Sequence, residues 1–431
     1  MNQSATWLRS AVCVAVCLVA TGLYGCKSDN SDQEEPVQED AEYVPAADDF
    51  QHAYVLATDD APVETSSFRQ SMSLQSSASS TSSGGWTPQQ FLTAYNVNTV
   101  VAPNNKPLGY GIKVAIITAY HYSNLQNDLN KWASKYSQKP ITLNIINQAG
   151  NITNSNWALQ SCLAVQMLNA VAPGATVYVI EAKSVSQKDM QTAIQTAANI
   201  GVNIISMPFG APEFSTEGSL AHLFANTQIA WIAASGTGAG PTFPGTSPDV
   251  VAVGGTSPSL SASLVLLFET ALADSAAGMS IYERMPNYQM IPSVQNANTT
   301  AFRSVPDVAF NANPGSGAQV YVSILGGYFV VGGNSVSTSF FTGVVAIANQ
   351  FRKSQSKPML SSISTSSNPL QRSLYGLMSS NGGPTNSTVL NDVVDGYAGE
   401  GSYLAEPGYD IATGLGSLDV AAFVNYMANQ P

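Results

Sequence analysis

Residues 113–118 (KVAIIT), 176–181 (TVYVIE) and 202–207 (VNIISM) are apolar runs with the length of buried strands. Similar runs occupy Thr142–Asn147, Ile229–Ala234 and Val250–Val253. Several of the intervening segments have the apolar spacing of helices, namely Leu125–Tyr136, Trp157–Val171 and Lys188–Ile200. Apolar strands that alternate with helices predict an α/β fold. We expect a parallel sheet with helices on both faces and ligands at the carboxyl ends of its strands.

The first 25 residues have the pattern of a lipoprotein signal peptide, in which Arg9 precedes an apolar run too short to span a membrane. The run ends in Leu23-Tyr24-Gly25-Cys26, which resembles the bacterial lipobox whose cysteine is lipidated. An ordinary cleaved signal is the alternative. The residue after Cys26 is Lys27 and not an aspartate, which resembles the pattern of lipoproteins sorted to the outer membrane. The sequence therefore predicts an exported lipoprotein anchored in the outer membrane or at the cell surface of a bacterium.

Residues 26–85 have the composition of a disordered tether. Residues 27–64 hold 12 acidic residues against one lysine, and 10 of residues 66–85 are serine. A segment with so few large apolar side chains cannot bury enough surface to offset its ordering entropy. From Trp86 onward there are 16 acids and 13 bases, which leaves no basic stripe for nucleic acid. We therefore expect a single folded domain over residues 86–431.

Cys162 is the only cysteine after Cys26, which excludes a disulfide framework. Its apolar neighbours, among them Leu159 and Leu163, indicate an inert buried thiol. A catalytic cysteine–histidine pair is the alternative.

The domain carries a set of short motifs in a fixed order. The motifs are Thr87-Pro88…Tyr95, Ala119-Tyr120, Ala172-Pro173-Gly174-Ala175, Ser206…Phe209-Gly210…Glu213, Ala234-Ser235-Gly236, Phe243-Pro244…Ser247-Pro248, Val253-Gly254-Gly255-Thr256-Ser257, Pro286…Tyr288-Gln289, Arg303…Pro306-Asp307-Val308-Ala309, Gly332-Gly333-Asn334-Ser335, and Gly408-Tyr409-Asp410…Thr413-Gly414-Leu415-Gly416. This ordered set resembles the sedolisin family of serine-carboxyl peptidases. The resemblance implies a subtilisin-like parallel sheet with helices on both faces, and a bound calcium ion.

Among the catalytic positions that this resemblance implies, only the nucleophile is retained, at Ser335. The glutamate that acts as base corresponds to Gln160, and the aspartate that orients it corresponds to Ala164. No Asp or Glu lies between Asp128 and Glu181, so a shift of alignment cannot restore the pair. The aspartate that serves the oxyanion corresponds to Thr237. An amide is not a base, and a serine hydroxyl without a base is a weak nucleophile.

Two other interpretations of these residues remain open. Ser335 can simply cap the helix expected over Val336–Asn349, since serine is a favoured N-cap. A histidine can replace the missing base, although His52 lies in the tether, His121 follows the first strand and His222 lies on an expected surface helix.

The resemblance also implies a peptide-binding strand and a calcium site. The glycine-rich strand of the family corresponds to Ser275-Ala276-Ala277-Gly278, which places methyl groups where a peptide backbone should approach. The calcium ligands correspond to Asp392 and Asp410 with the carbonyls of Val393, Glu406 and Gly408. Oxygen ligands of this kind suit Ca²⁺, and two acids on solvated turns are the alternative.

The sequence therefore favours an inactive peptidase that binds a peptide or protein in its inherited cleft. A working serine endopeptidase with a rearranged base and a structural envelope protein are the alternatives.

Overall fold

The computed structural model describes residues 55–57, 84–226, 228–294, 301–362, 369–378 and 388–431. The chain divides into Met1–Glu42 and Tyr43–Pro431, and the description below concerns the second unit. The expected signal peptide, Cys26 and most of the expected tether lie outside the described residues. Within them, no helix combines the length and the apolarity that crossing a membrane requires.

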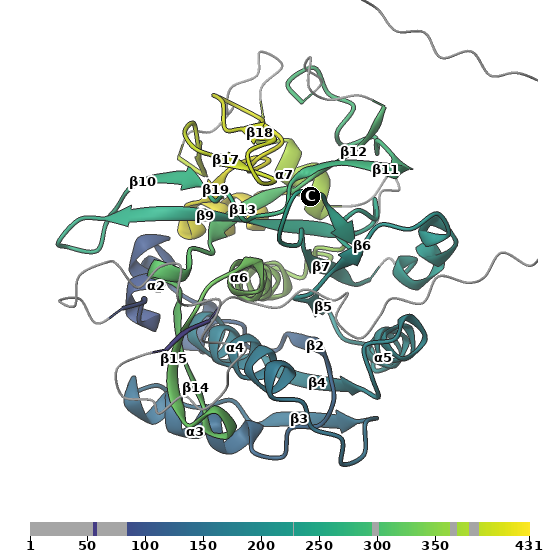
Figure 1. Cartoon of the computed structure of the whole chain (residues 1–431). Coiled ribbons are helices and arrows are strands. Elements are labelled where there is room, and N and C mark those ends of the chain that lie inside the picture. Colours follow the sequence, from purple (N-terminus) through teal and green to yellow (C-terminus); the bar gives the residue numbers. More distant parts are fainter. Residues whose placement is uncertain (1–54, 58–83, 227, 295–300, 363–368, 379–387) are drawn as a thin grey trace, which may run out of the picture. The chain divides into compact units, whose positions relative to one another are not determined.

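An eight-stranded sheet forms the centre of this unit (Figure 1). In spatial order its strands are β10 (Leu266–Ala271), β9 (Val251–Leu260), β7 (Ala230–Ala234), β5 (Ile204–Met207), β2 (Lys113–Ala119), β4 (Thr176–Ala182) and β3 (Leu143–Asn147), and β13 (Val308–Asn311) also pairs with β9. All of these pairs are parallel except β10–β9. The parallel sheet expected from the apolar runs is thus confirmed.

Both faces of the sheet are covered, as alternate side chains of β2 demonstrate. Val114 and Ile116 belong to one apolar cluster and Ala115 and Ile117 to another. The first cluster includes residues of α3 (Leu125–Lys135), α4 (Ser155–Val171), α6 (Asn334–Ser354) and α8 (Val420–Asn429). The second cluster includes residues of α5 (Gln187–Asn199). A strand buried on both sides explains why the run at residues 113–118 lacks polar alternation.

Helices α4 and α6 carry the candidate site and cross at close range. Every residue of α4 from Trp157 to Val171 is buried. At the crossing, a Cβ atom placed on Gly343 would lie 2.6 Å from the side chain of Val171. The absence of a side chain at Gly343 therefore lets the two helices approach each other.

The remaining elements surround this centre. They are α2 (Pro88–Ala94), α7 (Pro369–Tyr375), β1 (Val55–Ala57), β6 (Ala211–Pro212), β8 (Thr242–Phe243), β11 (Gly278–Arg284), β12 (Phe302–Val305), β14 (Ala318–Val322), β15 (Gly327–Val331), β16 (Leu390–Asn391), β17 (Tyr397–Ala398), β18 (Tyr403–Leu404), β19 (Ser417–Leu418) and the 3₁₀ turns η1 (Val97–Thr99), η2 (Pro103–Asn105), η3 (Glu217–Phe224), η4 (Pro314–Ser316) and η5 (Ser323–Leu325). Strand β1 pairs with β15, which differs from the flexible tether expected at residues 55–57.

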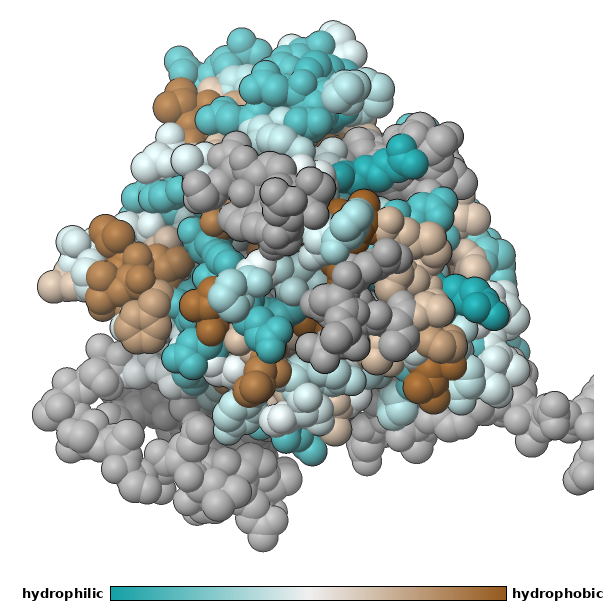
Figure 2. Space-filling model, turned by 90° about the horizontal axis from the view of Figure 1, so that it is seen from above, coloured by the Kyte–Doolittle hydropathy of each residue, from teal (hydrophilic) through white to brown (hydrophobic). Residues whose placement is uncertain are grey.

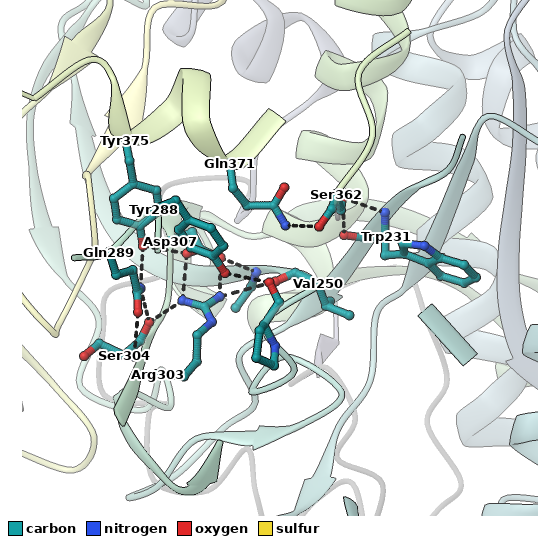
Figure 3. Close-up of polar contacts among 12 residues, drawn as sticks. Trp231, Val250, Tyr288, Gln289, Arg303, Ser304, Asp307, Ser362, Gln371 and Tyr375 are labelled. Atoms are coloured by element: carbon teal, nitrogen blue, oxygen red, sulfur yellow. Dashed lines mark hydrogen bonds and ion pairs between the residues drawn. The ribbon is translucent and has the colours of Figure 1, made fainter. Parts of the chain in front are cut away.

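A buried ion pair joins β9, β12, β13 and α7 (Figure 3). Two guanidinium nitrogens of Arg303 donate to the carboxylate of Asp307, at 2.8 and 2.5 Å. The same carboxylate accepts the Tyr375 hydroxyl at 2.6 Å and the backbone N–H of Ala252 at 2.8 Å. Burial lowers the pKa of Arg303, but Asp307, Tyr288 and Tyr375 together raise it above its ordinary value. The Arg303 and Asp307 motif residues thus have a structural role.

Candidate active site

Ser335 lies in the first turn of α6. The N-cap of this helix is Gly333, and no side-chain hydrogen bond caps it. The interpretation of Ser335 as a helix cap is therefore wrong, because the helix begins at Asn334, two residues earlier than expected. Ser335 is 4% exposed. Its Oγ donates to the backbone carbonyl of Pro208 at 2.8 Å.

The carbonyl of Pro208 joins Ser335 to Gln160. Pro208 follows β5, at the carboxyl end of the central sheet, and Gln160 lies in the second turn of α4. The Gln160 Nε2 donates to the same carbonyl at 3.0 Å. If the amide nitrogen and oxygen of Gln160 were exchanged, its oxygen would face the carbonyl oxygen of Pro208, and two acceptors would repel each other. The orientation with Nε2 toward Pro208 is therefore favoured. Two of the residues expected at the site, Ser335 and Gln160, thus meet because both donate to the same backbone carbonyl.

The third position, Thr237, directly follows two residues that Asn334, the neighbour of Ser335, contacts. The Asn334 Nδ2 donates to the carbonyl of Gly236 at 2.6 Å, to Ser235 Oγ at 2.9 Å and to Ser275 Oγ at 3.0 Å. This amide therefore holds the loop after β7 against the first turn of α6. The sequence indicated no such role for Asn334, and only its position beside Ser335 could have drawn attention to it.

Ala164 lies one turn beyond Gln160 and is fully buried in the main apolar cluster. Among the described residues, no carboxylate lies within hydrogen-bond distance of Ser335 Oγ. The Oε1 atom of Gln160 is buried, and no described residue forms a hydrogen bond with it. A serine hydroxyl, an amide and a backbone carbonyl meet here, and none of them is a base of useful strength.

Comparison with known proteins identifies the family to which this fold belongs. The pattern of the subtilase family (Peptidase S8) matches residues 102–386. The chain belongs to the subtilase family. Sedolisin of Pseudomonas sp. (strain 101) is 30% identical over 201 residues, which cover 43% of this chain and 30% of sedolisin. Kumamolisin of Bacillus sp. (strain MN-32) is 30% identical over 289 residues, which cover 59% of this chain and 48% of kumamolisin.

Solved structures agree on the fold of this subtilase. Pseudomonas sedolisin, described as a serine-carboxyl proteinase in complex with two molecules of pseudo-iodotyrostatin, superposes with a TM-score of 0.66. It is 24% identical, and the match covers 80% of this chain and 99% of that one. The sedolisin resemblance and the subtilisin-like fold expected from the motifs are confirmed. The chain spans less than half of the length of the two curated relatives named above.

The strand expected to receive a peptide in this subtilase is paired on both sides. Ala276 N donates to Gly236 O at 3.1 Å, and Gly238 N donates to Asp274 O at 3.0 Å. On the other side, Gly399 N donates to Ser275 O at 2.8 Å and Glu400 N to Ala273 O at 3.0 Å. Ala276 and Ala277 are fully buried. A peptide could pair with this segment only if one of these two partners, residues 236–238 or residues 399–400, moved away.

Neither histidine of the described domain is bonded to Ser335. His121 Nδ1 lies 2.6 Å from Glu181 Oε2, where β2 and β4 end. His222 is exposed on η3, the surface location that was expected. Cys162 is fully buried, and burial raises the pKa of its thiol well above the ordinary value. The expected burial of the thiol is confirmed, and its inertness stays a prediction.

The residues expected to hold calcium lie in one loop region, which two segments form, 392–393 and 406–410. Asp392 Oδ2 accepts the N–H of Gly408 at 2.9 Å, and Asp410 accepts the N–H groups of Glu406 and Thr413 at 3.0 and 2.7 Å. Burial, with a contribution from Asp392, raises the pKa of Asp410 to about 7. In the described residues, no three His, Cys, Asp or Glu side chains converge as a metal site, so carbonyls would have to complete the ligand set. Two neighbouring carboxylates on such a loop fit a hard cation, and calcium itself stays a prediction.

Proposed function

We propose that this chain is an exported lipoprotein whose sedolisin-type domain binds a peptide or protein without cleaving it. The observation that carries the proposal is the hydrogen bond from Ser335 Oγ to the carbonyl of Pro208, which Gln160 shares. A carbonyl accepts a hydrogen bond but does not take up a proton near neutral pH, so it holds the hydroxyl without activating it.

The loss of rate expected from the missing catalytic groups supports an inactive site. Removing members of a catalytic unit costs on the order of 10⁴–10⁶ in rate and leaves about 10³–10⁴ over water. Gln160 and Ala164 replace two such members, and Thr237 replaces the acid expected at the oxyanion. Loss of an oxyanion donor alone costs about 10²–10³, although these losses are not additive.

Digestion of a peptide library from pH 3 to pH 8 tests the loss of activity. The full chain and its Ser335→Ala variant should give the same products at the same background rate. Cleavage by the unmodified chain that Ser335→Ala abolishes would contradict the proposal and support a working endopeptidase.

Rebuilding the missing groups tests the cause of the inactivity. The triple variant Gln160→Glu, Ala164→Asp and Thr237→Asp should gain weak activity at acid pH, because a carboxylate then stands beside Ser335. Gln160→Asn, which shortens the amide and supplies no base, is the matched control. Equal activity in the control and the triple variant would contradict this explanation.

The binding role requires a partner, which a panel of immobilised peptides can supply. Thr237 is half-buried, so Thr237→Arg should block the mouth of the site and abolish capture of any specific peptide. Thr192→Arg, at an exposed position of α5, should leave capture unchanged. If no peptide is captured, or if the two variants behave alike, binding in the inherited cleft is wrong and a structural envelope protein becomes the better description.

We also propose a calcium ion held by Asp392, Asp410 and the carbonyls of Val393, Glu406 and Gly408. A ligand that binds only the folded state raises its stability. Excess chelator should therefore lower the melting temperature of the full chain, and Asp410→Asn should remove the response. A melting temperature that chelator leaves unchanged would argue against the site.

Membrane anchorage through lipidated Cys26 is proposed from the signal pattern alone. Mass spectrometry of the N-terminal peptide from a bacterial host should find an acylated Cys26, and Cys26→Ser should release the protein from membranes. An N-terminus cleaved elsewhere and without acylation would identify an ordinary secreted protein.

A further inference from the structure

The edge of the central sheet ends in a projecting hairpin. Strands β9 and β10 pair antiparallel, and β10 is the last strand of the sheet on that side. The turn is closed by hydrogen bonds from Ser261 N to Val265 O and from Leu264 N to Ser261 O, both 2.9 Å. In Figure 1 this hairpin extends to the left of the sheet. The two turn bonds hold its tip in a defined shape.

The tip exposes large apolar side chains. Val265 is 55% exposed, Leu267 61% and Phe268 58%. The strand register shifts between Leu266 and Phe268, and the two consecutive residues Leu267 and Phe268 both face solvent there. Figure 2 shows a group of hydrophobic residues projecting at the left of the molecule. Such a cluster of exposed apolar side chains is a candidate interaction surface.

The hairpin also lacks charge. No Asp, Glu, Lys, Arg or His occurs between Asp249 and Glu269, and Glu269 itself is buried. It therefore offers nothing with which a charged protein surface could pair. By contrast, the exposed apolar side chains of the hairpin require no polar partners in hydrocarbon.

The area of the tip favours a bilayer over a second copy of this chain. The three side chains expose on the order of 300 Å² together. A stable dimer buries about 800 Å² on each partner, more than twice that amount. Shallow insertion into lipid has no such threshold when another anchor already holds the protein at the surface.

We propose that the hairpin tip, Val265, Leu267 and Phe268, inserts into the surface of a lipid bilayer. The lipid proposed at Cys26 would keep the domain within reach of that bilayer, and to this extent the inference rests on the proposed function. The tip is a second, weaker contact that orients the domain on the membrane. Because it is uncharged, salt should not weaken the contact.

Fluorescence quenching by brominated lipid tests the insertion directly. The full chain with Phe268→Trp is reconstituted into vesicles of phosphatidylethanolamine and phosphatidylglycerol in which part of the lipid carries bromine in its acyl chains. Bromine quenches tryptophan on contact, and the signal of the unmodified chain is subtracted. We expect quenching of the new tryptophan at low and at high salt. The control is Ile152→Trp, at an exposed position outside the hairpin, which should not be quenched.

A second readout uses the Cys26→Ser background, which removes the proposed lipid. There, Leu267→Ser combined with Phe268→Ser should weaken vesicle binding by roughly tenfold for each side chain. Absence of quenching at Phe268→Trp, equal quenching in the control, or dimerisation that these serine substitutions abolish would overturn the inference. If mass spectrometry finds the natural Cys26 unacylated and Phe268→Trp is still quenched, the hairpin contact is supported and only the lipid anchor is rejected.

Discussion

Replacement of Glu217 by glutamine should reverse its effect on stability between acid and alkaline pH. Glu217 is almost fully buried beside Glu213, with which it shares a hydrogen bond. Its oxygens accept the N–H of Phe214 and the hydroxyl of Thr246, both at 3.2 Å. Burial first, and then repulsion by Glu213, raises the pKa of Glu217 to about 9.

The direction of the pH dependence follows from proton binding. The unfolded chain releases the Glu217 proton near pH 4.5, whereas the folded chain retains it until about pH 9. Between these values the folded state binds more protons, so its stability falls as pH rises, by about 1.4 kcal/mol per pH unit. At pH 8 the loss reaches roughly 5 kcal/mol as an upper bound, because the effect is shared with Glu213.

Glutamine removes this dependence because it does not ionise. Its amide nitrogen also takes the place of one accepting oxygen, which costs about 1 kcal/mol at every pH. Glu217→Gln should therefore be about 1 kcal/mol less stable than the parent chain at pH 4 and about 1–4 kcal/mol more stable at pH 8.

Urea unfolding of the full chain at pH 4, 6 and 8 measures the difference, provided that the denaturant slopes agree. Glu400→Gln, at an exposed position, is the matched control and should change stability little at any pH. A Glu217→Gln effect of the same sign and size at all three pH values would refute the reasoning.

Three further predictions concern packing and burial. Asp307→Asn should destabilise the fold by about 3–5 kcal/mol in urea unfolding, since it leaves the buried Arg303 charge unpaired, whereas Asp395→Asn at an exposed position should change little. Gly343→Ala should cost about 1–3 kcal/mol, because its methyl group meets the side chain of Val171, and an additional Val171→Ala substitution should recover part of the loss. Finally, Cys162 should stay unmodified by a maleimide in the folded protein and react once urea unfolds it, as peptide mass mapping can show; rapid labelling of the native chain would contradict its burial.

Much of the fold could be predicted from the sequence. The strand expected at Thr176–Glu181 extends one residue further, to Ala182, and the helix expected at Trp157–Val171 begins two residues earlier. These elements depend on the local spacing of apolar side chains, which is visible along the chain. The antiparallel β10 was not predicted, because its exposed apolar residues lack the alternation of a half-buried strand.

The candidate site was predictable only in its residue types. That Gln160 and Ala164 are not acids is a property of the chain alone, and no fold can change it. That Ser335 donates to Pro208, 127 residues away, could not be inferred in this way. Its partner is a backbone carbonyl, and every residue has one.

The sequence by itself thus determined the alternation of strands and helices up to Val253 and the absence of the acids at Gln160, Ala164 and Thr237. Only the tertiary structure decided which atoms surround Ser335, which carboxyls lie beside Glu217 and which apolar side chains stay in solvent at the β9–β10 turn. The physical reason is the separation along the chain over which each effect acts. Apolar periodicity acts over a few residues, whereas hydrogen bonding, desolvation and exposure depend on segments that the fold brings together from distant parts of the chain.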